Sequence, residues 1–122
     1  MNRQGPLPLY LHGAIEYVAA LAFIVAPFVL AFISETAIAA SIVVGVVILF
    51  VAATTKGPTS LVDTIPLLVH QALDFLLAIA LIGAPFALGF SDETNPTVFF
   101  IGLGVVHLLV TIATRFVPAS AS

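Results

Sequence analysis

Residues 8–36, PLYLHGAIEYVAALAFIVAPFVLAFISET, recur at residues 66–94 as PLLVHQALDFLLAIALIGAPFALGFSDET, and the two segments are identical at 14 of 29 positions. Some of the differences are conservative, as where Asp74 stands in place of Glu16. The segments that follow also align after a one-residue slip in the turn. The matched pairs there include Gly45 and Gly104, Thr55 and Thr114, and Lys56 and Arg115. Such a repeat indicates an internal duplication, so one structural unit should occur twice.

The composition indicates the environment of the chain. Apolar residues make up 61% and charged residues 7%, with a mean hydropathy of +1.26, so polar side chains are too few to cover a soluble globule. Four apolar stretches approach the ~20 residues that cross about 30 Å of hydrocarbon as a helix. They are residues 12–32, 37–54, 67–90 and 97–114. We therefore predict an all-α membrane protein with four transmembrane helices, arranged as two tandem two-helix repeats.

The repeats and the few cations predict how the chain is divided and how it crosses the membrane. The expected parts are a first repeat at 1–56, a cytoplasmic linker at 57–65, a second repeat at 66–115 and a C-terminal tail at 116–122. Arg3, Lys56 and Arg115 share one side if the four stretches cross in turn. Because positive charge favours the cytoplasmic side, we expect both termini in the cytoplasm and a bacterial inner (plasma) membrane. Each repeat crosses twice, so the two copies should be related by a twofold axis along the membrane normal.

The first half of each repeat carries an acidic-aromatic pair followed by a Pro-Phe tail. In the first copy these are Glu16-Tyr17 and residues 26–32, APFVLAF, and in the second they are Asp74-Phe75 and residues 84–90, APFALGF. This pattern resembles the SPW repeat of small bacterial membrane proteins, with Ala-Pro-Phe in place of Ser-Pro-Trp in both copies. The resemblance implies a two-helix membrane unit and implies no particular activity.

Ionisable side chains share one face of the first and third predicted helices. His12 precedes Glu16 by four residues, as His70 precedes Asp74, and most of the alanines lie on the same faces. Small residues mark close helix approach, so these side chains should point into the bundle, about one turn or roughly 6 Å from the cytoplasmic boundary. With His107 of the fourth helix they form a candidate intramembrane polar cluster. We interpret the cluster as mutually satisfied structural groups, with a proton-titratable site as the alternative.

Metal or haem binding is a second alternative for this cluster, because His12 and His70 should lie at one height with two carboxylates beside them. The spacing differs from the Glu-x-x-His pattern of ferritin-like di-iron proteins, so the sequence predicts no metal site and no cofactor. It also predicts no catalytic residues and no enzyme, because no catalytic triad or phosphate-binding loop can be assembled.

Prolines, glycines and aromatic residues predict local features. Pro27 and Pro85 free the carbonyl four residues back, so each should kink its helix, and Gly45 and Gly104 should permit close packing. Asn95-Pro96 should begin the fourth helix. Aromatic residues near the ends of the stretches are interpreted as lipid-facing anchors. They are Tyr10, Tyr17, Phe28, Phe32, Phe86 and Phe90.

The expected function is that of a small polytopic membrane protein with a non-enzymatic structural or accessory role. The alternative is a small proton-coupled transporter or ion-conducting oligomer that uses Glu16 and Asp74. The second apolar stretch holds no ionisable residue, which favours the accessory role. Expected partners are the lipid bilayer and either further copies of the chain or a larger membrane complex. Nucleic acid is not expected, because three Lys and Arg residues are too few to form a basic surface.

Overall fold

The computed structural model describes residues 6–55 and 60–114, and these form four α-helices. They are α1 (Leu9–Val29), α2 (Glu35–Thr54), α3 (Leu67–Ala87) and α4 (Thr94–Ala113). Each is long and apolar enough to cross a membrane, which confirms the prediction of an all-α, multi-pass membrane protein. The three cations behind the predicted topology, Arg3, Lys56 and Arg115, lie outside the described residues.

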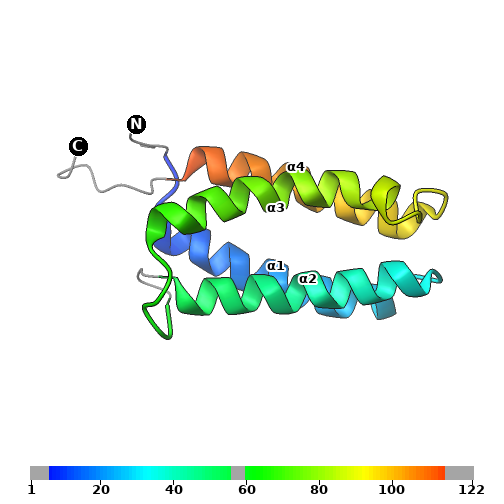
Figure 1. Cartoon of the computed structure of the whole chain (residues 1–122), viewed down its shortest axis with the longest axis horizontal. Coiled ribbons are helices and arrows are strands. Elements are labelled where there is room, and N and C mark those ends of the chain that lie inside the picture. Colours follow the sequence, from blue (N-terminus) through cyan, green and yellow to red (C-terminus); the bar gives the residue numbers. More distant parts are fainter. Residues whose placement is uncertain (1–5, 56–59, 115–122) are drawn as a thin grey trace.

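The helices form two hairpins that lie side by side, as Figure 1 shows. Helix α1 packs against α2, and α3 packs against α4. Both hairpin turns lie at one end of the bundle, while the start of α1, the connection from α2 to α3 and the end of α4 lie at the other. At that second end, main-chain bridges pair Leu7 with Thr114 and Thr55 with Ile65. Helices α1 and α3 therefore run in the same direction and begin beside the ends of α4 and α2.

Helix α1 begins earlier than the sequence indicated. The carbonyl of Pro8 accepts the amides of Leu11 and His12, both at 3.2 Å, so the first turn forms directly after the proline. Glu16 consequently lies seven residues into the helix, about 10 Å from its start.

Helix α4 also begins earlier, which corrects the prediction that Asn95-Pro96 starts it. Its N-cap is Glu93, and Pro96 is its third residue. A proline is tolerated there because the amides of the first turn have no partner within the helix. The side chain of Asn95 instead donates to the carbonyl of Leu30 on the other hairpin, at 2.7 Å.

Helices α1 and α3 end in matching turns. Ala31 (φ 53°) and Gly89 (φ 80°) adopt the left-handed conformation. The next amide then bonds back to the proline carbonyl inside the helix, which is the bond of a Schellman motif. The two bonds are Phe32 N to Pro27 O and Phe90 N to Pro85 O, both 2.9 Å.

These turns explain why the prediction of six lipid-facing aromatic anchors is wrong at two positions. Phe32 and Phe90 are only 6% and 1% exposed, because the residue after a left-handed turn commonly packs back on its own helix. The ring of Phe90 lies 5.2 Å from that of Phe100 in the core. Phe28 and Phe86, by contrast, are exposed on the outside of the bundle.

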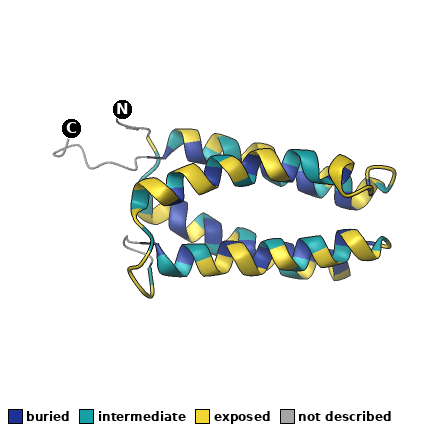
Figure 2. Ribbon diagram, in the orientation of Figure 1, coloured by how far each residue is buried: buried dark blue, intermediate teal, exposed yellow. Residues whose placement is uncertain are grey.

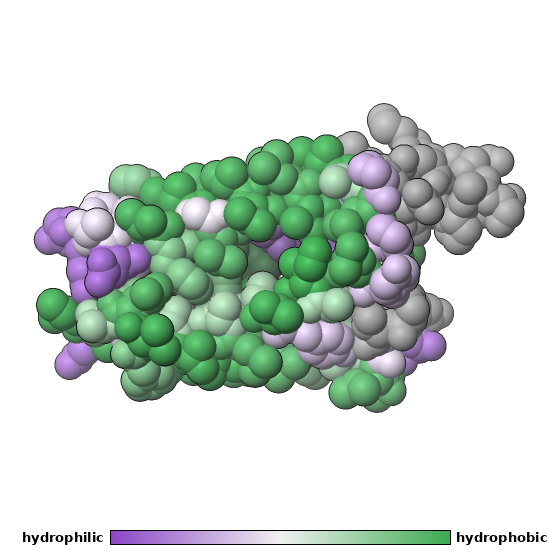
Figure 3. All heavy atoms as spheres, turned by 180° about the vertical axis from the view of Figure 1, so that it is seen from behind, coloured by the Kyte–Doolittle hydropathy of each residue, from purple (hydrophilic) through white to green (hydrophobic). Residues whose placement is uncertain are grey.

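The outer surface of the bundle is apolar along its length. Exposed residues occur on every helix in Figure 2, and large apolar ones include Leu21, Val46, Leu76 and Leu109. Figure 3 shows hydrophilic residues gathered at the two ends of the molecule, and a hollow partway along in which hydrophilic atoms are visible. A surface of this kind suits a bilayer, because lipid tails solvate apolar side chains along the whole length of the helices.

Candidate functional site

Four ionisable side chains meet inside the bundle, towards the end where α1 and α3 begin. His12 and Glu16 lie one turn apart on α1, and His70 and Asp74 repeat this spacing on α3. All four are at most 4% exposed. Because the two helices are parallel and carry the same pair at the same height, their polar faces meet. These four residues are called the quartet below.

Each histidine of the quartet contacts both carboxylates through Nε2. His12 Nε2 lies 2.9 Å from Asp74 Oδ2 and 3.1 Å from Glu16 Oε2. His70 Nε2 lies 2.8 Å from Glu16 Oε2 and 3.1 Å from Asp74 Oδ2. The four atoms therefore form a closed ring of alternating nitrogen and oxygen that joins α1 to α3.

A threonine holds the other ring nitrogen of each histidine. Thr114 Oγ1 lies 2.7 Å from His12 Nδ1, and Thr55 Oγ1 contacts His70 Nδ1. Each hydroxyl donates its single proton to the main-chain carbonyl four residues earlier, at 2.6 Å. The threonine oxygen is then left to accept, so Nδ1 of each histidine carries a proton and donates it. Nε2 is left to meet the carboxylates.

Thr55 and Thr114 occupy matching positions in the two repeats, but no role was predicted for either. They are the C-cap residues of α2 and α4. The bridges from Thr114 to Leu7 and from Thr55 to Ile65 place each hydroxyl beside the helix that starts there. The alignment of the repeats marks these two threonines as equivalent, but it does not indicate which helix ends lie next to each other in the fold.

His107 lies beside the quartet on α4. Its Nε2 is 3.4 Å from Asp74 Oδ1, and the centre of its ring is 6.3 Å from that of His12. This Nε2 is buried and has no hydrogen-bond partner among the described residues. The aligned residue of the first repeat is Ile48, so the fifth ionisable group breaks the symmetry of the site.

Gly45 and Gly104 lie where the helices of each hairpin approach closely. A methyl group at Gly45 would come within 2.7 Å of the carbonyl oxygen of Ala20, and one at Gly104 within 3.1 Å of that of Ala78. Both alanines are fully buried, one turn beyond Glu16 and Asp74 respectively. These close contacts fix the depth of each carboxylate-bearing helix against its neighbour.

Pro27 lies within α1 and Pro85 within α3. The two repeats differ in whether a neighbouring helix offers a hydrogen bond to the carbonyl four residues before the proline. In the first repeat, the hydroxyl of Ser41 on α2 donates to Phe23 O at 2.6 Å. The residue of α4 that aligns with Ser41 is Phe100, which has no polar group to offer.

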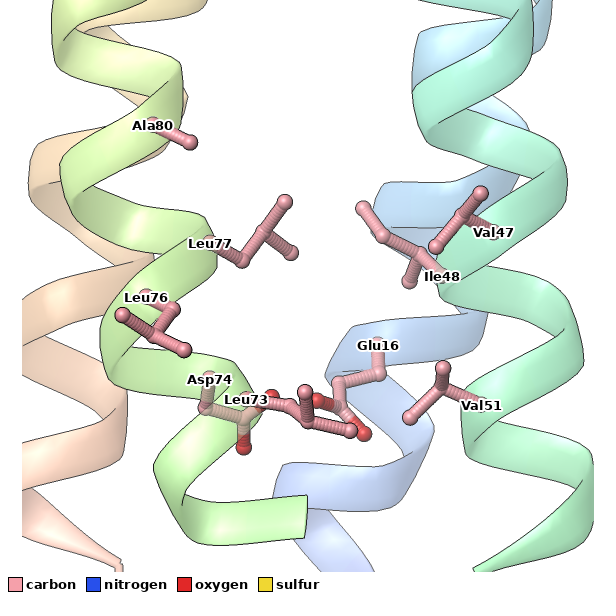
Figure 4. A pocket seen from close by; sticks show the side chains of 9 residues that line it. All are labelled: Glu16, Val47, Ile48, Val51, Leu73, Asp74, Leu76, Leu77 and Ala80. Carbon is pink, nitrogen blue, oxygen red and sulfur yellow. The ribbon is translucent and has the colours of Figure 1, made fainter. Parts of the chain in front are cut away.

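A crevice of about 260 Å³ reaches the carboxylates from between α2 and α3. Figure 4 shows Glu16 and Asp74 together at one end of it, with apolar side chains along its walls. The wall residues are Val47, Ile48 and Val51 of α2 and Leu73, Leu76, Leu77 and Ala80 of α3. The corresponding space between α1 and α4 is about 30 Å³ and is lined partly by His107. Access to the quartet is therefore wider from the α2–α3 side.

Comparison with known proteins identifies the repeat. A family model described as the SPW repeat domain matches residues 10–114. This range contains the quartet, His107 and both threonines, and it confirms the relationship indicated by the Pro-Phe pattern. No curated protein and no solved structure matches the chain.

Proposed function

This chain belongs to the SPW repeat family, and we propose that it is a non-enzymatic membrane protein with a structural or accessory role. In this role it packs as a subunit of a membrane complex or as a homo-oligomer in a bacterial inner membrane, with both termini and the 57–65 linker in the cytoplasm. The observation that carries the proposal is that Glu16 and Asp74 each contact a histidine of the opposite hairpin. The quartet thereby fastens the two hairpins to each other.

A second polar contact joins the two hairpins at the end of the bundle where the hairpin turns lie. The carboxylate of Glu93 accepts the amides of Ile33 and Ser34, at 2.6 and 2.9 Å, and so joins the second hairpin to the first. Polar groups at both ends of the bundle are thus used in contacts between the hairpins. This use favours a shape-holding role for them.

The space between these two sets of contacts holds few buried polar side chains. Among the described residues, the buried side chains there are apolar apart from His107, which lies beside Asp74, and Ser41, whose hydroxyl is bonded to Phe23 O. The rings of Phe23 and Phe90 pack against Phe100 at 5.4 and 5.2 Å. A proton path across a membrane runs through polar groups or water, so this aromatic packing favours the structural role.

One observation favours the alternative of a small proton-coupled transporter or ion-conducting oligomer. The crevice between α2 and α3 reaches Glu16 and Asp74, which are the groups such a protein would use. An oligomer that places a second chain against this crevice would extend the polar path beyond one chain.

Proteoliposome flux separates the two functions. The unmodified protein and the double variant Glu16→Gln/Asp74→Asn are reconstituted with an internal pH-sensitive dye, and Glu35→Gln, at an exposed carboxylate, serves as the control. We expect no proton flux from any of them, and a lower unfolding temperature or loss of co-purifying partners only for the double variant. Flux in the unmodified protein that disappears in the double variant would contradict the structural role.

A further inference from the structure

We propose that the quartet is a binding site for one divalent first-row transition-metal ion, coordinated by His12 Nε2, His70 Nε2, Glu16 Oε2 and Asp74 Oδ2. The spacing of these residues along the sequence is not that of a di-iron protein and predicted no metal site. The fold nevertheless brings four metal-binding groups together, because two parallel helices each contribute one imidazole and one carboxylate to the same point. The inference does not depend on the accessory role.

The four donor atoms surround a common centre. They lie within 4.8 Å of one another, and the four sides of the ring measure 2.9, 3.1, 2.8 and 3.1 Å. Donors that share one zinc ion at about 2.0–2.2 Å lie roughly 3–3.6 Å apart, so the separations in the quartet are close to those of donors around a single ion. The two helices therefore bring four donor atoms within reach of one ion.

The threonines prepare the histidines for this role. Thr114 and Thr55 hold the Nδ1 protons of His12 and His70, so a neutral ring presents the Nε2 lone pair to the centre. A ligating histidine usually donates its other nitrogen to a fixed acceptor, which sets the tautomer and the ring orientation. The same arrangement occurs on both sides of the site.

Charge also favours a divalent cation. Two carboxylates with two neutral imidazoles carry a total charge of −2, and all four side chains are nearly inaccessible to solvent. Without an ion, a proton on each Nε2 balances this charge and makes the contacts with the carboxylate oxygens possible. A divalent ion balances the same charge when it replaces these two protons. Imidazole with carboxylate suits zinc, iron, copper or nickel, whereas magnesium and calcium prefer sites built from oxygen alone.

His107 supplies an independent observation. Its unpartnered, buried Nε2 lies 3.4 Å from Asp74 Oδ1, the carboxylate oxygen outside the ring. If Asp74 Oδ2 binds the metal, a proton on His107 Nε2 points towards Oδ1 of the same carboxylate. This contact would hold the carboxylate in its ligating orientation.

Cobalt titration tests the proposal directly. The full chain in nanodiscs is stripped with a chelator, dialysed and titrated with Co²⁺, whose visible absorption reports ligand number and type. We expect saturation at one Co²⁺ per chain, with visible bands that disappear when Zn²⁺ displaces it. Absence of both bound metal and visible bands in the unmodified protein would overturn the proposal, whatever the variants do.

Two variants locate the site. Glu16→Gln/Asp74→Asn keeps the side-chain shapes and removes both anionic ligands, so uptake should fall at least 100-fold while far-UV circular dichroism stays helical. Glu35→Gln removes an exposed carboxylate at the opposite end of the bundle and should retain full uptake. If the double variant does not fold, the single variant Glu16→Gln is titrated instead and should bind at least tenfold more weakly. Unchanged uptake in the folded double variant, or in the single variant, would show that the ion binds elsewhere.

Discussion

Glu16 Oε2 lies closer to His70 Nε2 on the opposite hairpin, at 2.8 Å, than to His12 Nε2 on its own helix, at 3.1 Å. Asp74 repeats the relationship, at 2.9 Å across the hairpins and 3.1 Å within α3. Each histidine also meets a threonine of the opposite hairpin at Nδ1, so neither hairpin alone supplies all the partners of its buried polar groups. Formation of the quartet and docking of the hairpins are one event, which makes their stability interdependent.

The first prediction concerns this interdependence. Glu16→Gln should lower the free energy of unfolding by about 3 kcal/mol, because it removes one partner of a buried ion pair and leaves the other unsatisfied. Asp74→Asn should cost a similar amount, and the double variant clearly less than the sum, since both act on one network. Denaturant titration of helicity in detergent measures all three, with Glu35→Gln as an exposed control expected to change stability by less than about 0.5 kcal/mol. Strictly additive losses would contradict a single network.

The second prediction concerns the close approach of α1 and α2. Gly45→Ala should destabilise the protein by about 1–3 kcal/mol, because the new methyl group meets the main-chain oxygen of Ala20 at 2.7 Å. Gly102→Ala is the matched control within α4, where a Cβ would meet no heavy atom of the described residues within 4 Å. It should be neutral or stabilising by up to about 1 kcal/mol, as expected for alanine in a helix. Equal effects at the two glycines, measured by thermal unfolding, would rule out the tight crossing.

The third prediction concerns the turns that end α1 and α3. Ala31 occupies a left-handed position that in the second repeat is held by Gly89. Ala31→Gly should therefore raise stability by up to about 1 kcal/mol, and Gly89→Ala should lower it by about 1 kcal/mol, because the Cβ is disfavoured there. The paired unfolding temperatures test the sign at each site. The same direction of change at both positions would be inconsistent with equivalent turns.

A fourth prediction links Ser41 to the proline on the facing helix. Ser41→Ala should cost about 1 kcal/mol, because it removes the hydrogen bond to Phe23 O. Pro27→Ala restores an amide that can reach the same carbonyl, so the serine should matter less in that background. A double-mutant cycle on unfolding free energies measures this coupling, and a coupling of zero would separate the two residues.

Much of this architecture was predictable from sequence, for identifiable reasons. Four apolar stretches of membrane length specify four helices, and alanine-rich polar faces specify which side of each helix is buried. Periodicity indicates which face of a helix is buried but does not say which helix covers it. For that reason the sequence suggested His12 beside Glu16, while the shortest contacts of the quartet run between hairpins.

The features that sequence reasoning missed depend on the ends of the helices. Thr55 and Thr114 reach the histidines only because main-chain bridges bring the ends of α2 and α4 to the starts of α3 and α1. Phe32 and Phe90 are buried because a left-handed residue precedes each of them, and the conformation of Ala31 is not evident from residue type. Helix ends are set by local hydrogen bonds that hydrophobic patterning does not encode.

The last prediction concerns orientation in the membrane. The structure brings the start of α1, the α2–α3 connection and the end of α4 to one end of the bundle, so the segments that carry Arg3, Lys56 and Arg115 should share a side. Reporter fusions after Lys56 and after Ser122 should both report the cytoplasm, and fusions near Glu35 and Asp92 the exterior, because positive charge is retained inside. Replacing Lys56 and Arg115 with Gln should weaken this bias and give mixed reporter signals. A fusion after Ser122 that reports the periplasm in the unmodified protein would reverse the assigned orientation while leaving the bundle itself intact.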